Sequence, residues 1–349
     1  MDWHSSNRQD EFYFTSVDPE TMRDTGFLDM LMDGATVERN ALTATKTAAT
    51  VPFYSQLPEG NYWMRLYSRS TLGDDVATLC LGTFMPSVPA RTVEYAMSTG
   101  SANLYSLLHL LEEQLLPYPL SLAAGTQSIA KAVELAQECG LATHADSSAS
   151  VLQSTATFDA GTSYMEVVNW LLDYAGFRSV DIDPQGAALM RRYYDPALDQ
   201  PAYTLTDDGA AAFAPQVTHE MDEFAVPNRL VALCSNQEQT LTAVVDNDDP
   251  ANRYSIPSRG RVIATAAEIE QIDSQEALEA WAASQLYSKT SAVESVTITT
   301  PYQPWDINDA VRIEYKAAGL DFTGTVVSKS MALTPGMPTS TRLRRFVRF

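Results

Sequence analysis

The sequence predicts an α+β, β-rich protein in which two β-barrel-like domains flank an inserted α+β domain. Short β-branched and aromatic runs, separated by turn residues, fill the first hundred residues. The hydrophobic period then becomes helical, and strand-like alternation returns near residue 296. We therefore divide the chain into residues 1–100, completed by about 226–265, then an insertion over 101–225, and a helix with the second β-domain over 266–349.

The chain of 349 residues is strongly acidic, with a formal net charge of −21 and a pI near 4.4. This charge disfavours binding to the outside of a nucleic acid or to an anionic membrane, because both attract clustered Lys and Arg. The one basic cluster is the segment 341–349, which carries four arginines. We expect these arginines to meet acidic neighbours across a subunit contact, since guanidinium groups suit ion pairs at interfaces.

Targeting signals are not expected. Residues 1–20 lack a basic region followed by an apolar stretch, so they do not resemble a secretory signal. The most apolar stretch, 104–124, is interrupted by charged residues and two prolines, so we expect no membrane anchor. The cysteines Cys80, Cys139 and Cys234 form no CxxC pair and are expected to be buried thiols in a reducing compartment.

The first region is predicted to be made of strands. They are expected over 12–17, 48–54, 62–68, 76–84 and 92–97. Between them, the segments 18–19, 58–60 and 73–75 supply Pro, Gly and Asp residues typical of turns.

Three helices are expected in the insertion. Leucines recur at helical spacing over 104–115, and a second helix over 127–139 ends at Gly140, as a C-cap glycine would end it. The third begins with a capping box formed by Ser163 and Glu166, and it ends before Gly176. After it, strands over 177–182 and 188–193 with a turn at 183–186 predict a β-hairpin.

Strands return in the last third of the chain. Those over 228–245 and 261–264 are expected to complete the first β-domain. A last helix begins near Asp273 or Ser274 and carries Leu278, Trp281, Ala282 and Leu286 on one face. Alternation at 296–298 and 311–316 predicts the final β-region, with further strands over 322–333 and 342–349.

Motifs for catalysis are missing. The histidines His4, His109, His144 and His219 are scattered, and none belongs to an HExxH pattern that binds zinc on one helix face. The sequence also lacks a GxSxG elbow, a Walker-type phosphate loop and a GxGxxG motif after a strand. We therefore expect no enzymatic activity, no catalytic or metal-binding residues and no cofactor.

Two acidic loops invite a calcium interpretation. Asp181, Asp183 and Gly186 copy the start of a calcium loop, but Arg192 stands where the bidentate Glu is needed, so we predict a hairpin turn instead. The segment 246–249 lacks the glycine and the terminal ligand of an EF-hand. An irregular cation site at 246–249 remains an open alternative.

Other candidate residues are assigned to structural roles. The carboxylate pairs Glu112–Glu113 and Asp222–Glu223 are interpreted as solvated faces, because 44 acidic residues make such neighbours frequent by chance. Trp63, Trp170, Trp281 and Trp305 lie within strand or helix patterns and are expected to pack in the core.

The order of segments after residue 150 resembles that of the baseplate or tail-hub family of tailed phages and related injection machines. The first set comprises 158–163, the capped helix to Leu172, 174–177, the hairpin turn 181–186 and 193–196. The second comprises 226–230, 244–248 and Arg259-Gly260, and the third 300–309 followed by 324–328. Residues 1–100 match the family only in their expected strand content.

This resemblance implies a ring-forming structural protein. In such hubs two similar β-barrel domains lie side by side, and three copies give six barrels around a pore that joins the tail tube to the distal tip. The implied partners are other copies of the chain, a tail-tube or distal tail protein above, and tip, spike, fibre or tape-measure proteins below. DNA is expected to pass without specific binding, in a virion assembled in the host cytoplasm.

Two other functions stay open at the level of sequence. The first is a receptor-binding or adhesin protein of the same particle, which an exposed aromatic or cation site at a distal tip would favour. The second is a cell-wall hydrolase that uses a dispersed pair of carboxylates.

Overall fold

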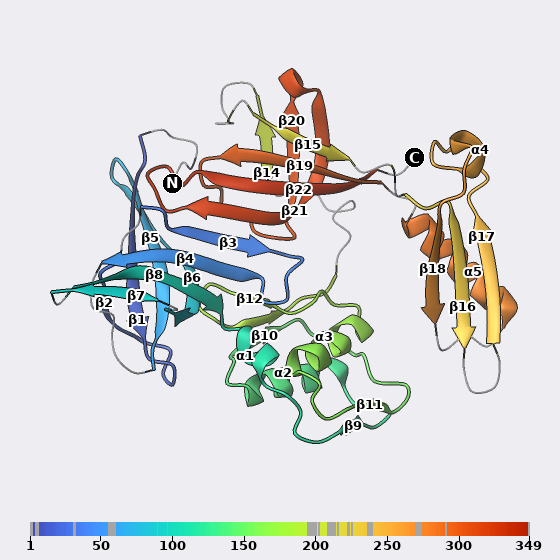
Figure 1. Ribbon diagram of the computed structural model, residues 1–349, viewed down its shortest axis with the longest axis horizontal. Helices are drawn as coiled ribbons and strands as arrows, with labels where there is room; N and C mark the ends of the chain where they lie inside the picture. The colour runs from blue at the N-terminus through green and yellow to red at the C-terminus, as the bar shows by residue number, and fades with distance from the viewer. Residues whose placement is uncertain are drawn as a thin grey trace. The chain divides into compact units, whose positions relative to one another are not determined.

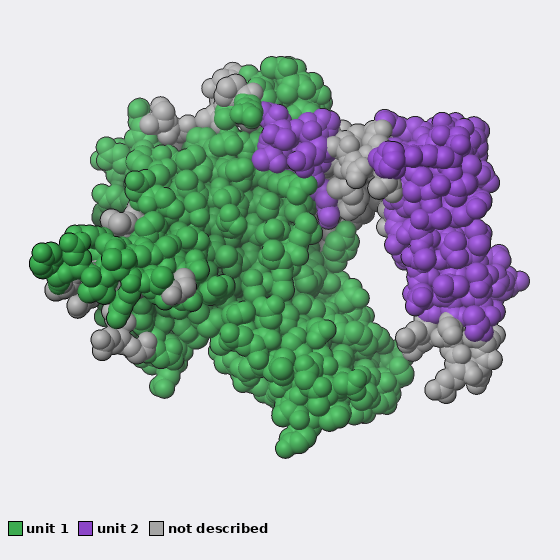
Figure 2. Space-filling view, in the orientation of Figure 1, with its two compact units in different colours: residues 1–216, 298–342 green, residues 217–297, 343–349 purple. Residues whose placement is uncertain are grey.

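The computed structural model describes the chain apart from residues 1–2, 4–6, 31–32, 55–60, 89, 96, 194–200, 202, 208–213, 215, 222–223, 225, 236–239, 270–273, 290–291 and 348–349. It divides into two compact units, coloured separately in Figure 2. Unit 1 comprises residues 1–216 and 298–342, and unit 2 comprises residues 217–297 and 343–349.

Fourteen of the described strands belong to one large, mostly antiparallel sheet (Figure 1). They are β1 (Gln9–Val17), β2 (Asp24–Leu28), β3 (Thr36–Asn40), β4 (Thr47–Tyr54), β5 (Trp63–Leu72), β6 (Asp75–Ser87), β7 (Arg91–Glu94), β8 (Met97–Ser106), β14 (Tyr203–Thr206), β15 (Thr218–Met221), β19 (Ala292–Thr300), β20 (Ala310–Tyr315), β21 (Leu320–Ala332) and β22 (Thr339–Val347). The predicted β-rich α+β character is thereby confirmed.

The N-terminal and C-terminal β-regions meet at one strand pair. Strand β21 runs antiparallel to β3, with Ser328 opposite Asn40 and Ala332 opposite Thr36. The main path runs β15-β19-β22-β21-β3-β4-β8-β6-β5-β1-β2, so these described strands form an open path with β15 and β2 at its ends. Alternating apolar residues such as Val37, Val51 and Leu66 are fully buried beneath it.

The insertion has its own apolar core. Its elements are α1 (His109–Glu113), β9 (Leu120–Leu122), α2 (Ser128–Glu138), β10 (Thr143–Ala145), β11 (Ala156–Phe158), α3 (Tyr164–Tyr174), β12 (Asp181–Ile182) and β13 (Ala188–Met190). One face of α3, with Val167, Val168 and Leu171, is completely buried among the residues of this core. In the structure β12 and β13 pair antiparallel, so the predicted hairpin is confirmed.

The helix signals in the sequence of the insertion agree with the structure, except at the start of the insertion. The Ser163 hydroxyl accepts a hydrogen bond from the backbone N–H of Glu166, and the Glu166 carboxylate accepts one from the backbone N–H of Ser163, which confirms the capping box. The helix expected over 104–115 is shorter, because residues up to Ser106 pair as β8 with β4 and β6. Only α1 remains helical in that stretch.

Residues 226–265, which we expected to complete the first β-domain, form a separate sheet. Strands β16 (Arg229–Ser235), β17 (Thr240–Asp246) and β18 (Ala264–Ile269) pair in the order β17-β16-β18, with the short helix α4 (Ile256–Arg259) before β18. The reason is packing: one face of β16 carries Leu230, Ala232 and Cys234, which form a core with helix α5 (Gln275–Lys289). The predicted apolar face of α5 is confirmed by the burial of Leu278, Ala282 and Leu286.

Among the described residues, no helix combines the length and hydropathy that crossing a membrane requires.

Candidate functional site

The first candidate site is a group of four charges that we call the ionic cluster: the buried Arg39 and Lys329 and the partly exposed Asp181 and Asp306. Arg39 on β3 and Lys329 on β21 are direct cross-strand neighbours. Two like charges in this position repel each other unless anions lie between them. Asp306 supplies one, with Oδ1 at 2.9 Å from Arg39 Nε and 3.3 Å from Lys329 Nζ.

The insertion supplies the second anion. Asp181 on β12 lies with Oδ1 at 3.1 Å from Arg39 Nη2, and Arg39 Nη1 donates to the carbonyl oxygen of Ile182 at 3.0 Å. Lys46 extends the same contact by donating to Ser179 Oγ at 2.9 Å. The β12 end of the insertion is therefore bound to the sheet by charge-assisted hydrogen bonds.

Burial dominates the electrostatics of the ionic cluster. It raises the pKa of Asp181, although the charges of Arg39 and Lys46 act in the opposite direction. It also lowers the pKa of Lys329 and of Lys46, against the attraction of nearby carboxylates. Since these charges face one another, the cluster is suited to holding two parts of unit 1 together, and we assign it a structural role.

A second contact holds the hairpin turn between β12 and β13. Arg65 on β5 donates to Thr83 Oγ1 at 2.8 Å and pairs with Asp24 at 3.0 Å, and Thr83 Oγ1 donates to the carbonyl oxygen of Pro184 at 2.9 Å. Gly186 has φ of +98°, and a Cβ there would lie 2.7 Å from Leu107 Cδ1. The turn therefore needs glycine both for its conformation and for space.

The residues of the calcium alternative at this turn have other partners. Asp181 is held by Arg39, and Asp183 Oδ1 accepts the backbone N–H of Ala187 at 2.8 Å, which closes the turn. In the 246–249 segment, Asp246 makes two hydrogen bonds of 2.6 Å with Arg229. Across the described part of the chain, no group of three or more His, Cys, Asp or Glu side chains has a metal-binding arrangement.

The remaining sequence candidates are dispersed. Glu112 and Glu113 lie at 2.8 and 3.3 Å from the two ring nitrogens of His109. His144 lies 3.8 Å from Asp183, and His219 belongs to β15. The predicted candidates His4, Asp222 and Glu223 lie outside the described residues.

Two of the tryptophans are in the places expected of core residues. Trp305 is buried, and Trp281 packs against the core of unit 2. Trp63 is half-buried against the core of the insertion. Trp170 differs, because it is 40% exposed and stacks on Tyr174 at 5.5 Å.

Cys139 and Cys234 are buried, as expected, whereas Cys80 is only partly buried. Burial raises the pKa of Cys80 and Cys139 to about 11. At neutral pH both are protonated, and a protonated thiol is a poor nucleophile.

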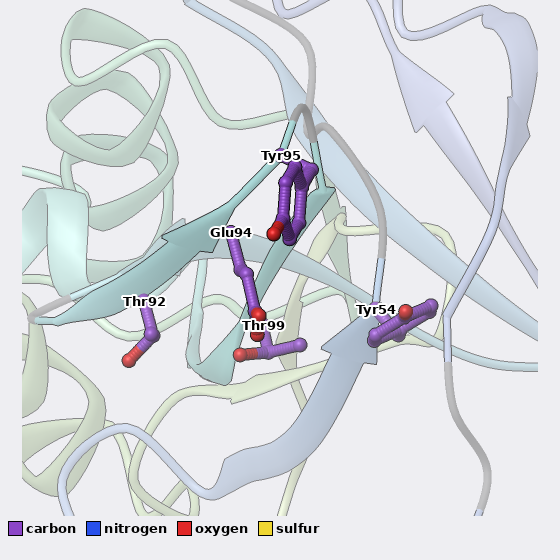
Figure 3. Close-up of a pocket in the computed structure, with 5 residues that line it drawn as sticks. All are labelled: Tyr54, Thr92, Glu94, Tyr95 and Thr99. Atoms are coloured by element: carbon purple, nitrogen blue, oxygen red, sulfur yellow. The ribbon is translucent and has the colours of Figure 1, made fainter.

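The second candidate site, which the sequence did not reveal, is a pocket at the β7–β8 hairpin (Figure 3). We call it the hairpin pocket, and it is lined by Tyr54, Thr92, Glu94, Tyr95 and Thr99. The sequence predicted one strand over 92–97, whereas the chain turns at Tyr95 and returns as β8. The pairing with β4 that adds Tyr54 is too distant along the chain to be seen in a local pattern.

The fold matches solved structures over nearly all of the chain. No protein-family model matches the sequence, and no curated protein matches it. The tail protein from Neisseria meningitidis MC58 has a TM-score of 0.67 at 12% identity, covering 96% of this chain and 96% of that chain. The 43 kDa tail protein of prophage MuSo2 from Shewanella oneidensis has a TM-score of 0.64 at 11% identity, covering 96% and 98%.

A further match is part of a larger chain. A chain in the half-lidded PdpA–VgrG complex from Francisella has a TM-score of 0.58 at 8% identity, covering 99% of this chain and 59% of that chain. The resemblance predicted from residues 150–349 is thus confirmed at the level of the fold, and it extends to the first hundred residues.

Proposed function

We propose that a chain with this tail-protein fold is a structural hub subunit of a phage or phage-derived tail tip or baseplate. The observation that supports the proposal is that the structural match covers nearly all of both proteins, 96% of this chain and 96% of the Neisseria tail protein. Both units therefore have counterparts in a tail protein of similar length. The proposed role is structural and requires no catalytic residue, metal or cofactor.

The proposed assembly is a trimeric ring. Each copy contributes two β-barrel-like regions, the first from residues 1–100 and the second from strands β19 to β22, with 101–225 as the insertion. The pairing of β3 with β21 supports this plan, because it joins the two β-regions of one copy directly. A closed ring of identical subunits needs complementary interfaces rather than a chemical site.

The acidic composition fits a channel for DNA. With a net charge of −21 per copy, a lumen lined by carboxylates repels phosphates, and DNA passes without adhering. Counter-ions screen the repulsion between copies, so assembly is expected to strengthen with salt.

The proposed partners follow from the same role. The ring would bind a tail-tube or distal tail protein above it, and tip, spike, fibre or tape-measure proteins in or below it. One matched chain belongs to the Francisella PdpA–VgrG complex, which supports association with other tail or spike proteins. The proposed location is the virion, after assembly in the host cytoplasm.

Native mass spectrometry of the purified chain tests the ring directly. Three copies of 38.3 kDa give a trimer of about 115 kDa, which we expect to increase with protein and salt concentration. A monomer that persists at every concentration, with or without a co-expressed tail-tube protein, would contradict the hub.

A pair of matched variants tests the proposed role of the C-terminal arginines. Arg342 is exposed on β22, and we expect Arg342→Ala to reduce the trimer fraction. Arg191→Ala is the control, because it removes the same charge from a different region, the insertion, where Arg191 pairs with Asp146. An equal loss of trimer in both variants would show that the effect is one of overall charge and not of a subunit contact.

A further inference from the structure

The hairpin pocket is built by the register of three strands. Thr99 on β8 is the cross-strand partner of Tyr54 on β4 and of Thr92 on β7. Directly opposed residues project from the same face of a sheet, and so does Glu94, two positions after Thr92. These four side chains therefore form one row across the face of β4, β8 and β7.

Tyr95 adds an aromatic wall to this row. It occupies the turn after β7 with φ of +55°, a backbone conformation that residues other than glycine seldom adopt. Its side chain is 94% exposed, and Figure 3 shows it pointing from the turn along the same side as Glu94. Glu94 pairs with Met97, so Tyr95 lies in a two-residue hairpin loop, where a positive φ is the geometry that the turn requires.

The size of the pocket restricts what it can bind. Its volume is about 410 Å³, which lies within the range of about 300–1,000 Å³ typical of small-molecule sites. A single lysine or arginine side chain from a partner protein would leave most of that space empty. Anionic ligands are disfavoured, because the one charged group among the described lining residues is the carboxylate of Glu94.

The lining matches one class of neutral ligand. Tyr54 and Tyr95 offer apolar ring faces with polar hydroxyl groups at their tips. Thr92 and Thr99 offer hydroxyl groups that donate and accept, and the Glu94 carboxylate accepts two or more hydrogen bonds. A sugar ring has a face of C–H groups and a rim of hydroxyls, so its face suits the tyrosines and its rim suits Glu94 and the threonines.

We infer that the hairpin pocket binds a neutral saccharide, with the sugar stacked on tyrosine and its hydroxyls bonded to Glu94. This inference goes beyond the hub role and does not depend on it, since it is argued from the chemistry of the lining residues alone.

Saturation-transfer-difference NMR on the full chain tests the pocket. The probes are short oligosaccharides of glucose, galactose, rhamnose and N-acetylglucosamine, with an arginine-rich peptide as a competing ligand class. We expect transfer to at least one saccharide, strongest at its C–H face. Tyr95→Ala is expected to weaken that binding by about tenfold, because it removes a stacked aromatic face.

Further variants separate stacking from hydrogen bonding. Tyr95→Phe keeps the ring and should retain binding, whereas Glu94→Gln keeps the shape and should weaken it by removing the charged acceptor. Tyr118→Ala is the matched control, since Tyr118 is 78% exposed but lies outside the pocket. Circular dichroism establishes that each variant is folded.

Three results would overturn the inference. They are the absence of saturation transfer to all of the saccharides, transfer to the peptide alone, and equal losses in the Tyr95 and Tyr118 variants. Each of these leaves the mass of the assembly unaffected, so the hub proposal is judged separately.

Discussion

The insertion and unit 2 combine helices and short strands in similar ways, but they place their charges differently. In the insertion, Asp181 is half-buried and pairs with Arg39 of β3, whose side chain is only 6% exposed. In unit 2, Arg229 and Asp246 form a closer pair, with 2.6 Å between Nε and Oδ1, yet both remain partly exposed. The distance alone therefore does not indicate how strongly a pair constrains the fold.

The two ion pairs differ in whether water can solvate a charge after its partner is removed. The Arg39 side chain is 6% exposed, so water cannot take the place of its carboxylate partners, whereas the Arg229 side chain is 35% exposed and has solvent beside it. A buried pair adds little net stability compared with apolar packing, but it penalises every arrangement that separates its partners. The ionic cluster thus specifies where the insertion lies on the sheet of unit 1.

The largest effect is expected from removing the buried cation. Arg39→Ala leaves Asp181 without its main counter-ion, which should lower the free energy of unfolding by about 3–5 kcal/mol. Adding Asp181→Asn should recover part of this loss, because the buried negative charge is then absent. Urea unfolding followed by pulsed hydrogen exchange of β12–β13 and of β16–β17 measures the two regions separately.

The control is Arg229→Ala in unit 2, which should have a much smaller effect, because solvent already screens the pair with Asp246. If both variants lost the same stability, burial would not be what distinguishes the two regions.

The two carboxylates should also respond to pH in opposite directions. Burial raises the folded-state pKa of Asp181, so its contribution to stability is present below the ordinary value of 3.8 and is lost as pH rises through the raised pKa. The hydrogen bond from Arg229 lowers the pKa of Asp246, so its contribution is present above 3.8 and is lost as pH falls through the lowered pKa.

Asparagine variants measured at about pH 3 and about pH 7 reveal these signs. Relative to wild type, Asp181→Asn should become more stable as pH rises, because asparagine resembles the protonated carboxyl group. Asp246→Asn should become less stable over the same interval. A common direction for both variants would refute the assignment of burial and ion pairing as the respective causes.

Sequence patterns predicted helices, strands and turns within the insertion and unit 2. They did not predict the contacts between residues that lie far apart in the chain. The capping box at Ser163, the 183–186 turn and the apolar face of α5 depend on residues a few positions apart. The pairing of Arg39 with Asp181 joins residues 142 positions apart. No local period encodes such a contact, because its partners are chosen by the register of strands that meet only in the folded chain.

The same limit explains the hairpin pocket and the sheet of unit 2. Tyr54 and Thr99 become neighbours only when β4 pairs with β8. The alternation in 228–245 predicted strands without indicating whether their apolar faces would meet another sheet or a helix. In the structure Leu230 and Ala232 pack with α5, and this choice depends on the tertiary arrangement.

The smallest effect on stability is expected from removing a serine that caps a helix. The insertion and unit 2 each have such a serine. Ser163 caps α3 in the insertion, and Ser255 caps α4 in unit 2 by accepting the backbone N–H of Ser258. Each serine replaced by alanine should lower stability by about 1 kcal/mol, since one backbone donor loses its partner.

The matched control is Gln127→Ala, because Gln127 precedes α2 without a side-chain capping bond. Hydrogen exchange of the first turn of each helix measures the change. A loss at Ser163 as large as that of Arg39→Ala would mean that local helix stability, rather than the ionic cluster, distinguishes the insertion from unit 2.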